Sequence, residues 1–311
     1  MPPDLKPAVT EAAARISAHV RRTPVLALEP GACGVDAAVV LKLECLQHTG
    51  SFKPRGAFNR ILSSTVPPAG VIAASGGNHG LATAHAARVL GLPAEIFVPD
   101  IAAPAKVARL RASGATVRVG GAGYAEAWEA CQVRQRVSGA LLVHAYDQPE
   151  VLAGQGTAAL ELEQQCPDLD TVLVAVGGGG LVGGVAGWFS GRVRVVGVEP
   201  ATAPTLHAAL AAGRPVDVAV SGLAADSLGA RRVGSHAFAQ ARAHLERVVL
   251  VPDEAIRVAR RALWDVVRVV AEPGGAAAFA ALLSGAYRPA PGERVAVLVC
   301  GANCDPGEVT T

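Results

Sequence analysis

The sequence lacks the charge and cysteine patterns that mark several common classes of protein. Its 311 residues carry a net charge of only +2 at pH 7. No strong excess of basic residues therefore indicates a nucleic-acid partner. The six cysteines include no Cys-x-x-Cys pair, which argues against a disulfide framework and a zinc site. We expect a small-molecule partner and a reducing compartment, with the cytoplasm as the default.

The sequence also lacks a charged and then apolar leader, and only one uncharged run is long enough to cross a membrane. This run covers residues 171–191 and contains four consecutive glycines. Adjacent glycines would interrupt a spanning helix, whereas a strand, a loop and a short helix account for the whole run. We therefore expect no membrane-spanning segment.

Repeats and low-complexity linkers are missing as well, and the chain instead alternates between strand-like and helix-like segments. Strand patterns occupy residues 37–44, 70–75, 94–99, 115–120, 140–145, 171–176, 192–199, 247–252 and 294–300. Helical patterns occupy residues 8–20, 54–64 and 150–165, and begin near residues 79, 103, 123, 181, 253 and 274. Apolar strands separated by helices indicate parallel sheets covered on both faces, so the predicted fold class is α/β. The length suggests about two domains.

The stretch LECLQHTGSFKPRGAF, residues 43–58, places Lys53 between a predicted strand and a predicted helix. Pro54 disfavours α geometry at the lysine and suits a first helical position, so the helix should begin just after Lys53. Such strand-to-helix junctions carry the chemistry of α/β proteins. Burial and nearby cations would lower the pKa of this amine and make it reactive. The alternative interpretation is an ordinary salt-bridged lysine beside Arg55.

A glycine loop, Gly177, Gly178, Gly179 and Gly180, follows the strand 171–176 and precedes a helix from Leu181. Glycine backbone N–H groups and a helix N-terminus together bind anions, so the loop predicts a phosphate site. A dinucleotide loop is the alternative. Gly178, Gly180 and Gly183 match its spacing in part, and Glu199 ends a strand about 20 residues later.

Four motifs together resemble the pyridoxal-phosphate-dependent serine and threonine dehydratase family. They are TGSFKPRGA around Lys53, SGGNHG at residues 75–80, GGGGLVGG at residues 177–184 and CGANCD at residues 300–305. Their order is that of the family, and they span residues 43–305. The resemblance is to fold type II, the tryptophan synthase β-like class, and to its serine racemase and threonine ammonia-lyase branch.

The resemblance implies a fold and a cofactor. Two domains with open, twisted parallel sheets are expected. Residues 1–69 and 148–311 would form the large cofactor-binding domain, and residues 70–147 would form the small domain with the substrate loop. The cofactor would be pyridoxal 5′-phosphate, attached to Lys53 as a Schiff base and bound by the residues Phe52, Asn78, Gly177, Gly178, Gly179, Gly180, Glu272 and Cys300.

Among these, Asn78 would bond the ring hydroxyl of the cofactor, and Cys300 would face its ring nitrogen. A neutral thiol cannot protonate the pyridine as a carboxylic acid would, so the ring should be a weak electron sink that favours expulsion of a β-leaving group. A buried apolar cysteine at the end of a core strand is the alternative interpretation of Cys300.

The residues Ser75, Gly76, Gly77, Asn78 and His79 would form the substrate loop, which grips the substrate carboxylate. The alternative is a Ser or Asn that caps a helix, and His79 is expected to be a structural neighbour, not a base. Relatives that racemise serine carry a second serine where this chain has Gly76. Racemisation should therefore be lost, because no proton donor remains opposite Lys53.

A divalent cation site is the weakest implication of the resemblance. Glu199 and the carbonyl of Ala203 match two ligands of such a site in the racemase-like branch. The third ligand there is an acid, whereas this chain has Thr205. One carboxylate makes a poor cage for Mg²⁺ or Ca²⁺, so we do not expect tight cation binding.

The resemblance implies β-elimination of L-serine or L-threonine to a 2-oxo acid and ammonia. The alternatives are a lyase for 3-hydroxyaspartate or another hydroxy-amino acid, a serine racemase, and a non-catalytic protein that binds a phosphate ligand. Only six residues follow Asp305, so no effector-binding domain is expected. A homodimer is the default association state.

Overall fold

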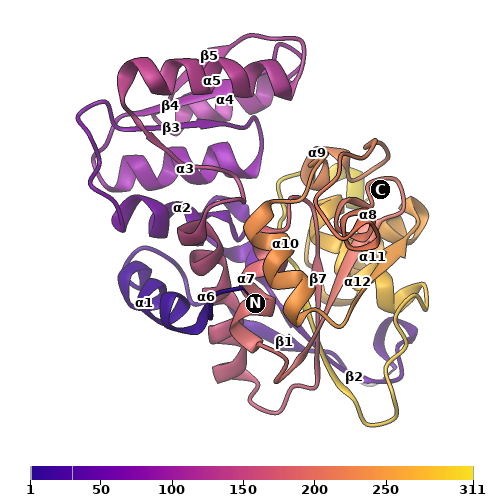
Figure 1. Ribbon diagram of the computed structural model, residues 1–311. Helices are drawn as coiled ribbons and strands as arrows, with labels where there is room; N and C mark the ends of the chain where they lie inside the picture. The colour runs from indigo at the N-terminus through magenta and orange to yellow at the C-terminus, as the bar shows by residue number, and fades with distance from the viewer. Residues whose placement is uncertain (1, 30, 311) are drawn as a thin grey trace.

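The computed structural model describes residues 2–29 and 31–310, and its strands form two sheets that lie side by side (Figure 1). The larger sheet has the strand order β1-β2-β10-β7-β8-β9, and the smaller has the order β5-β4-β3-β6. The antiparallel pair β1–β2 lies at one edge of the larger sheet, and the other strand pairs of the described chain are parallel. The predicted α/β class with parallel sheets is confirmed.

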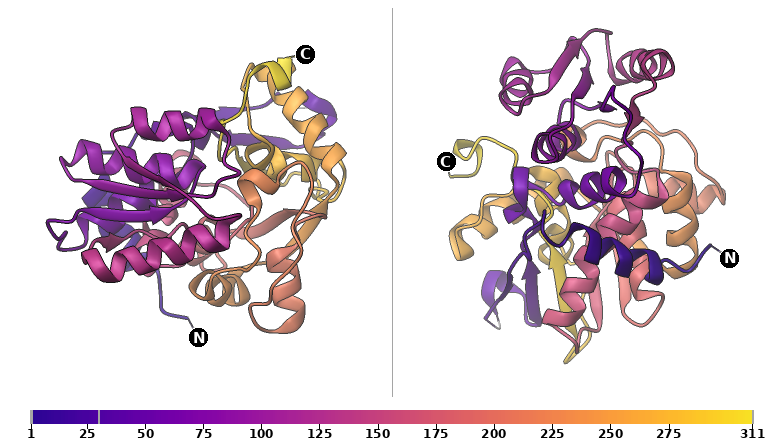
Figure 2. Two further views of the ribbon diagram at one scale, coloured as in Figure 1. Left: turned by 90° about the horizontal axis from the view of Figure 1, so that it is seen from above. Right: turned by 90° about the vertical axis from the view of Figure 1, so that its left-hand side faces the viewer.

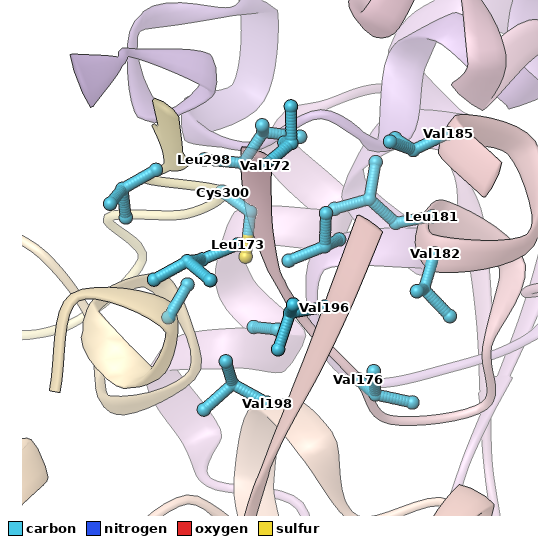
Figure 3. Close-up of a cluster of buried hydrophobic side chains, with 14 of the residues drawn as sticks. Val172, Leu173, Val176, Leu181, Val182, Val185, Val196, Val198, Leu298 and Cys300 are labelled. Atoms are coloured by element: carbon cyan, nitrogen blue, oxygen red, sulfur yellow. The ribbon is translucent and has the colours of Figure 1, made fainter. Parts of the chain in front are cut away.

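The larger sheet is apolar along its central strands because helices cover both faces. Its strands are β1 (Val25–Ala27), β2 (Ala38–Lys42), β7 (Thr171–Ala175), β8 (Arg194–Pro200), β9 (Arg247–Val251) and β10 (Arg294–Leu298). The helices around it are α1 (Lys6–Ile16), α6 (Pro149–Gln165), α7 (Gly180–Phe189), α10 (Ser235–His244), α11 (Asp253–Val267) and α12 (Pro273–Leu283). Figure 1 shows α7 and α12 on opposite sides of β7. Side chains of β7, β8 and α7 meet in one buried cluster (Figure 3).

The smaller sheet is also sandwiched between helices, as Figure 2 shows. Its strands are β3 (Val71–Ala74), β4 (Ala94–Val98), β5 (Thr116–Val119) and β6 (Leu141–Leu142). Its helices are α2 (Lys53–Leu62), α3 (Asn78–Val89), α4 (Pro104–Ala112) and α5 (Tyr124–Ser138). Along β3, Val71 and Ala73 belong to one apolar cluster, and Ile72 and Ala74 belong to another. This alternation is the two-residue period of a strand buried on both faces.

Short elements complete the chain, and most of them carried too weak a pattern to be predicted. They are η1 (Ala32–Gly34), η2 (Glu44–Leu46), η3 (His48–Gly50), α8 (Thr205–Ala212), α9 (Ala225–Leu228) and α13 (Gly307–Thr310). Several predicted boundaries differ from the structure. Helix α1 ends at Ile16, four residues before the predicted end at residue 20. Helix α2 begins at Lys53 itself, because Pro54 disfavours but does not forbid α geometry at the preceding residue. The strand predicted at residues 140–145 pairs only at Leu141 and Leu142.

The glycine-rich run 171–191 contains β7, the glycine loop and α7, a helix of 10 residues. Over the described residues, no helix has the length and apolar character that crossing a membrane requires.

The two sheets are built from different parts of the chain. All four strands of the smaller sheet fall within residues 70–147, and the strands of the larger sheet fall outside that range. Helix α2 connects the two parts, since it packs against both α6 and α3 while its apolar side chains join the core of the smaller sheet. The division into residues 1–69 with 148–311 and residues 70–147 stays a prediction.

A buried network of charges fixes the start of α2. Both Arg55 and Glu44 are 0% exposed, and Arg55 Nε donates to Glu44 Oε2 at 2.7 Å. Arg55 also donates to both carboxylate oxygens of Glu161 on α6, and Lys42 Nζ donates to Glu161 at 2.8 Å. Burial raises the pKa of Glu44, but Arg55, Lys42 and a hydrogen bond from Thr23 outweigh it, so the pKa lies below its usual value. Two cations and two anions therefore balance inside the protein.

Removal of one negative charge from this network should destabilise the protein, because the positive charge of Arg55 would stay buried and would no longer be fully balanced. We expect Glu44→Gln to lower the free energy of unfolding by about 3–5 kcal/mol. The matched control is Asp168→Asn, which removes a carboxylate that is 75% exposed in its pair with Arg294; its expected cost is at most about 1 kcal/mol. Urea denaturation of both variants gives the comparison, and equal costs would contradict this account.

Candidate active site

Two loops that are far apart in sequence pair through their backbones and bring Lys53 to the end of β10. Cys45 N donates to Val299 O at 2.8 Å, and Phe52 N donates to Cys300 O at 3.2 Å. Ser51 and Gly301 form an isolated bridge between the two loops. The pairing places the lysine loop, residues 45–53, along the loop that follows β10.

The Lys53 side chain is partly buried, and its amine has a backbone carbonyl as its partner. Its Nζ donates to Ala145 O at 2.8 Å and lies 5.0 Å from the centroid of the Phe52 ring. Burial lowers the pKa of Lys53 to about 8, against smaller opposing effects of Cys300 and Glu272. Among the described residues Lys53 forms no ion pair, and the hydrogen-bond acceptor of its amine is a backbone carbonyl, so the interpretation as an ordinary salt-bridged lysine is not supported.

The chain has only four lysines, at positions 6, 42, 53 and 106. Lys42 is bound by Thr23 O, Glu161 and Gln165, and Lys106 pairs with Asp226. Lys6 lies at the start of α1. Lys53 is therefore the lysine whose position and protonation suit attack on an aldehyde.

The glycine loop is shaped by what packs on it. A Cβ at Gly178 would lie 2.3 Å from the Tyr146 ring, and a Cβ at Gly177 would lie 3.1 Å from Leu228 Cα. Gly179 has φ +91°, a conformation that favours glycine. The loop ends at the start of α7, whose first N–H groups have no acceptors within the helix. These N–H groups and the positive end of the helix fit a phosphate group.

Asn78 and Glu272 meet opposite the lysine loop. Asn78 Nδ2 donates to Glu272 Oε1 at 2.6 Å, and Asn303 Nδ2 donates to Asn78 Oδ1, also at 2.6 Å. Within the described chain, this leaves one N–H of Asn78 for a ring oxygen. Burial raises the pKa of Glu272 to about 7, although the hydrogen bond from Asn78 acts in the opposite direction. A Cβ at Gly301 would lie 2.0 Å from Glu272 Oε1, so a glycine is required there.

The substrate loop lies between β3 and α3. Ser75 Oγ accepts a hydrogen bond from Gly77 N at 3.2 Å, while the N-cap of α3 is Gly77, so the capping interpretation of Ser75 and Asn78 was wrong. A Cβ at Gly76 would meet its nearest neighbours at 3.7 Å, which leaves room for a side chain. His79 Nε2 contacts Val143 O at 2.8 Å, and burial, together with Lys53, lowers the pKa of His79 to about 3. The neutral imidazole of His79 therefore has a structural role in the substrate loop.

Cys300 is buried in the apolar core, as one of its two interpretations predicted, and its role at the ring nitrogen stays a prediction. Its side chain lies in the buried apolar cluster beside β7 (Figure 3), and its Sγ donates to Gly274 O at 3.4 Å. Burial raises the pKa of the thiol, with Glu272 acting in the same direction. The thiol is therefore neutral and close to Lys53 and Glu272.

The segment 143–147 is a part of the site that sequence reasoning missed. It was predicted as the end of a strand, but it turns across the site as an irregular strap. Ala145 O accepts from Lys53, and Asp147 accepts from the N–H groups of Ser235 and His236 at the start of α10. Asn303 was also missed as an individual residue, although its motif CGANCD was recognised. The contacts of both segments join distant parts of the chain and leave no local signal.

The predicted cation ligands do not fit a metal ion. The Glu199 carboxylate accepts from Leu206 N at 2.7 Å and from His207 N at 2.8 Å, so it caps α8. Ala203 is completely buried. Across residues 2–29 and 31–310, no group of three or more His, Cys, Asp or Glu side chains could hold a metal ion. The cation prediction based on Glu199 and Ala203 is therefore not supported.

The site fits pyridoxal phosphate on four separate grounds. A buried amine with a lowered pKa can bind an aldehyde, and a glycine loop at a helix N-terminus can bind a phosphate. An amide N–H of Asn78 suits the ring oxygen, and a neutral thiol is present at Cys300. Glu272, which accepts a hydrogen bond from Asn78, is the acidic residue of this group.

Comparison with known proteins agrees with this chemistry. Residues 16–301 match the family model described as pyridoxal-phosphate dependent enzyme. An L-threonine ammonia-lyase of Geobacter sulfurreducens is 38% identical over 96% of this chain and 75% of its own length. A phenylserine dehydratase of Ralstonia pickettii is 36% identical over 97% of this chain and 94% of its own length.

Comparison of the fold with solved structures leads to the same family. The structure of maize serine racemase superposes with a TM-score of 0.91 and 32% sequence identity, and the match covers 97% of this chain and 94% of that one. The resemblance predicted from the four motifs is confirmed, and the chain belongs to the pyridoxal-phosphate-dependent enzymes of fold type II.

Proposed function

We propose that this enzyme is an ammonia-lyase that eliminates water from L-threonine and L-serine and releases a 2-oxo acid and ammonia. The observation that carries the proposal is the buried Lys53 amine, held by Ala145 O beside the glycine loop and the substrate loop. Relatives at about 38% identity are named for this reaction.

When bound, pyridoxal phosphate supplies the aldehyde that attaches the substrate amine and the ring that accepts electron density from the Cα–H bond. The residues of the chain supply position and proton transfer. The backbone around Ser75, Gly76 and Gly77 binds the substrate carboxylate, and Asn78 orients the ring. Lys53 Nζ takes the α-proton from one face. Its lowered pKa keeps a useful fraction of the amine unprotonated near neutral pH.

The neutral thiol of Cys300 helps to select elimination. A carboxylic acid behind the ring would protonate the ring nitrogen and make the ring a stronger electron acceptor, whereas a thiol with a raised pKa would not. Under these conditions, expulsion of a β-hydroxyl group should be faster than reactions that need a stronger electron acceptor. The face opposite Lys53 has Gly76, which provides no acid or base, so racemisation should be slow.

The proposal also covers how the cofactor is attached, where the enzyme is located and how its chains associate. We infer that Lys53 carries the cofactor as a Schiff base between turnovers. The six free cysteines suit a reducing compartment, so we propose a cytoplasmic enzyme. A homodimer is the commonest form of soluble oligomer, and residues 70–147 are proposed as the small domain.

Replacement of the lysine tests the reaction directly. We expect Lys53→Ala to lower turnover of L-threonine by at least about 1000-fold, because the α-proton loses its acceptor. Formation of 2-oxobutanoate and the visible absorbance of the bound cofactor provide the two readouts. Lys6→Ala, on α1, is the control and should retain full turnover. Full turnover by Lys53→Ala would refute the mechanism.

The pKa of Lys53 predicts how the apoenzyme takes up its cofactor. Only the neutral amine attacks an aldehyde, so the rate of attachment should rise with pH up to about 8 and then level off. An ordinary lysine would keep the rate rising until about pH 10. Rapid-mixing absorbance between pH 7 and pH 10 measures the profile. A rate that still rises tenfold per pH unit above pH 9 would show that burial does not lower this pKa.

The space at Gly76 allows the racemase alternative to be tested. Gly76→Ser should fold normally, because its Cβ would meet only ordinary contacts at 3.7 Å. We expect formation of D-serine from L-serine to rise about tenfold or more, since a hydroxyl now faces the side opposite Lys53. Gly76→Ala adds the same Cβ without the hydroxyl and should not gain this activity. Equal D-serine formation by both variants would contradict the explanation.

A further inference from the structure

Aromatic side chains are rare in this chain, yet several gather at one place. Aromatic residues make up 4% of the sequence, with only three tyrosines and three tryptophans. Tyr124 and Trp128 of α5 and His144 and Tyr146 of the strap form what we call the aromatic wall. The rings of Trp128 and His144 meet edge to face at 5.1 Å, and those of His144 and Tyr146 meet at 4.7 Å. Such pairs are favourable ring geometries.

The aromatic wall begins beside the reactive amine. Ala145, whose carbonyl binds Lys53 Nζ at 2.8 Å, lies between His144 and Tyr146 in the strap. Burial lowers the pKa of His144 to about 4, and Lys53 contributes in the same direction. The imidazole is therefore neutral at physiological pH. A substituent on the β carbon of a bound amino acid would meet uncharged rings.

The wall is fixed before any substrate binds. His144 Nδ1 accepts from Tyr146 N at 3.2 Å and from Asp147 N at 2.8 Å, which sets the ring orientation. The Tyr146 ring packs on Gly178, and its hydroxyl donates to Arg232 O at 3.3 Å. Tyr124 is 47% exposed, so this end of the wall is accessible from solvent. Preorganised rings bind a ligand at a lower entropic cost.

Two cations of α4 on the side of Glu272 and Asn303 are already engaged, which argues against their binding an acidic β-substituent. Lys106 of α4 pairs with Asp226 of α9. Arg109, one turn later on α4, donates to Asn303 Oδ1 at 2.7 Å. A substrate such as 3-hydroxyaspartate would have to displace these partners, whereas an apolar substituent would not.

We propose that the aromatic wall binds an aryl group on the β carbon, so that the preferred substrates are β-hydroxy-α-amino acids of the 3-phenylserine type. The inference rests on the proposed function and specifies its substrate class. Lys53 Nζ takes the α-proton, the Cβ–O bond breaks with its electron pair going to oxygen, and the departing hydroxyl takes up one proton and leaves as water, so that no net proton is gained or lost. The released enamine takes up water and yields phenylpyruvate and ammonia. The overall reaction consumes one phenylserine and needs no oxidant or reductant.

The experiment compares two substrates and separates the ring from the rest of each side chain. The quantity measured is the ratio of kcat/KM for L-threo-3-phenylserine to kcat/KM for L-threonine. For the parent enzyme this ratio should exceed one. We expect Tyr124→Leu and Tyr146→Leu each to lower it about three- to tenfold, the effect of one lost aromatic contact. Tyr124→Phe and Tyr146→Phe keep the ring and should leave the ratio within about twofold.

A binding measurement gives a second readout without turnover. L-phenylalanine and L-alanine have no β-hydroxyl group, so calorimetry on the holoenzyme measures affinity alone. We expect L-phenylalanine to bind at least tenfold more tightly than L-alanine, and Tyr146→Leu to remove most of this difference. If L-threonine is turned over while the Leu variants leave both the ratio and the affinities unchanged, the aromatic wall does not select the substrate. Ring-dependent binding of L-phenylalanine without turnover of either hydroxy-amino acid would support the wall and contradict the proposed function alone.

Discussion

The site depends on the backbone pairing between the lysine loop and the loop after β10. Hydrogen bonds from Cys45 N to Val299 O and from Phe52 N to Cys300 O join segments from opposite ends of the chain. Because of this pairing, a reactive amine, a neutral thiol and the Glu272 carboxylate share one small volume. The buried network around Arg55 fixes the helix that begins at Lys53, and so it also helps to fix the position of the lysine.

Burial, more than neighbouring charge, makes Lys53 reactive. From the sequence, burial and nearby cations were both expected to lower the pKa of the lysine, and Arg55 lies two residues away. In the structure Arg55 is balanced by Glu44 and Glu161, and the lowered pKa of Lys53 comes from burial. The two neighbouring basic residues therefore have different roles. Arg55 stabilises the start of α2, and Lys53 is available for the chemistry. The same burial keeps the thiol of Cys300 neutral.

Local patterns in the sequence predicted the parts of the site that are encoded locally. The alternation of apolar strands with helices predicted the α/β class, Pro54 located the start of α2 to within one residue, and four glycines marked the loop before α7. The meeting of Lys53 with Cys300 followed only from the family resemblance. The strap and the aromatic wall arise from contacts across the fold, so no spacing in the sequence revealed them. The family resemblance suggested Glu199 as a weak candidate for a metal ligand, and only the structure shows that its carboxylate caps α8.

The central claim is that one particular lysine, of the four in the chain, binds the cofactor aldehyde. Reduction of the holoenzyme with borohydride followed by peptide mass spectrometry tests it most directly, because reduction makes the attachment permanent. The account predicts one pyridoxyl phosphate group per chain, on the peptide that contains Lys53. Labelling of Lys6, Lys42 or Lys106 instead, or the absence of any labelled peptide, would contradict it.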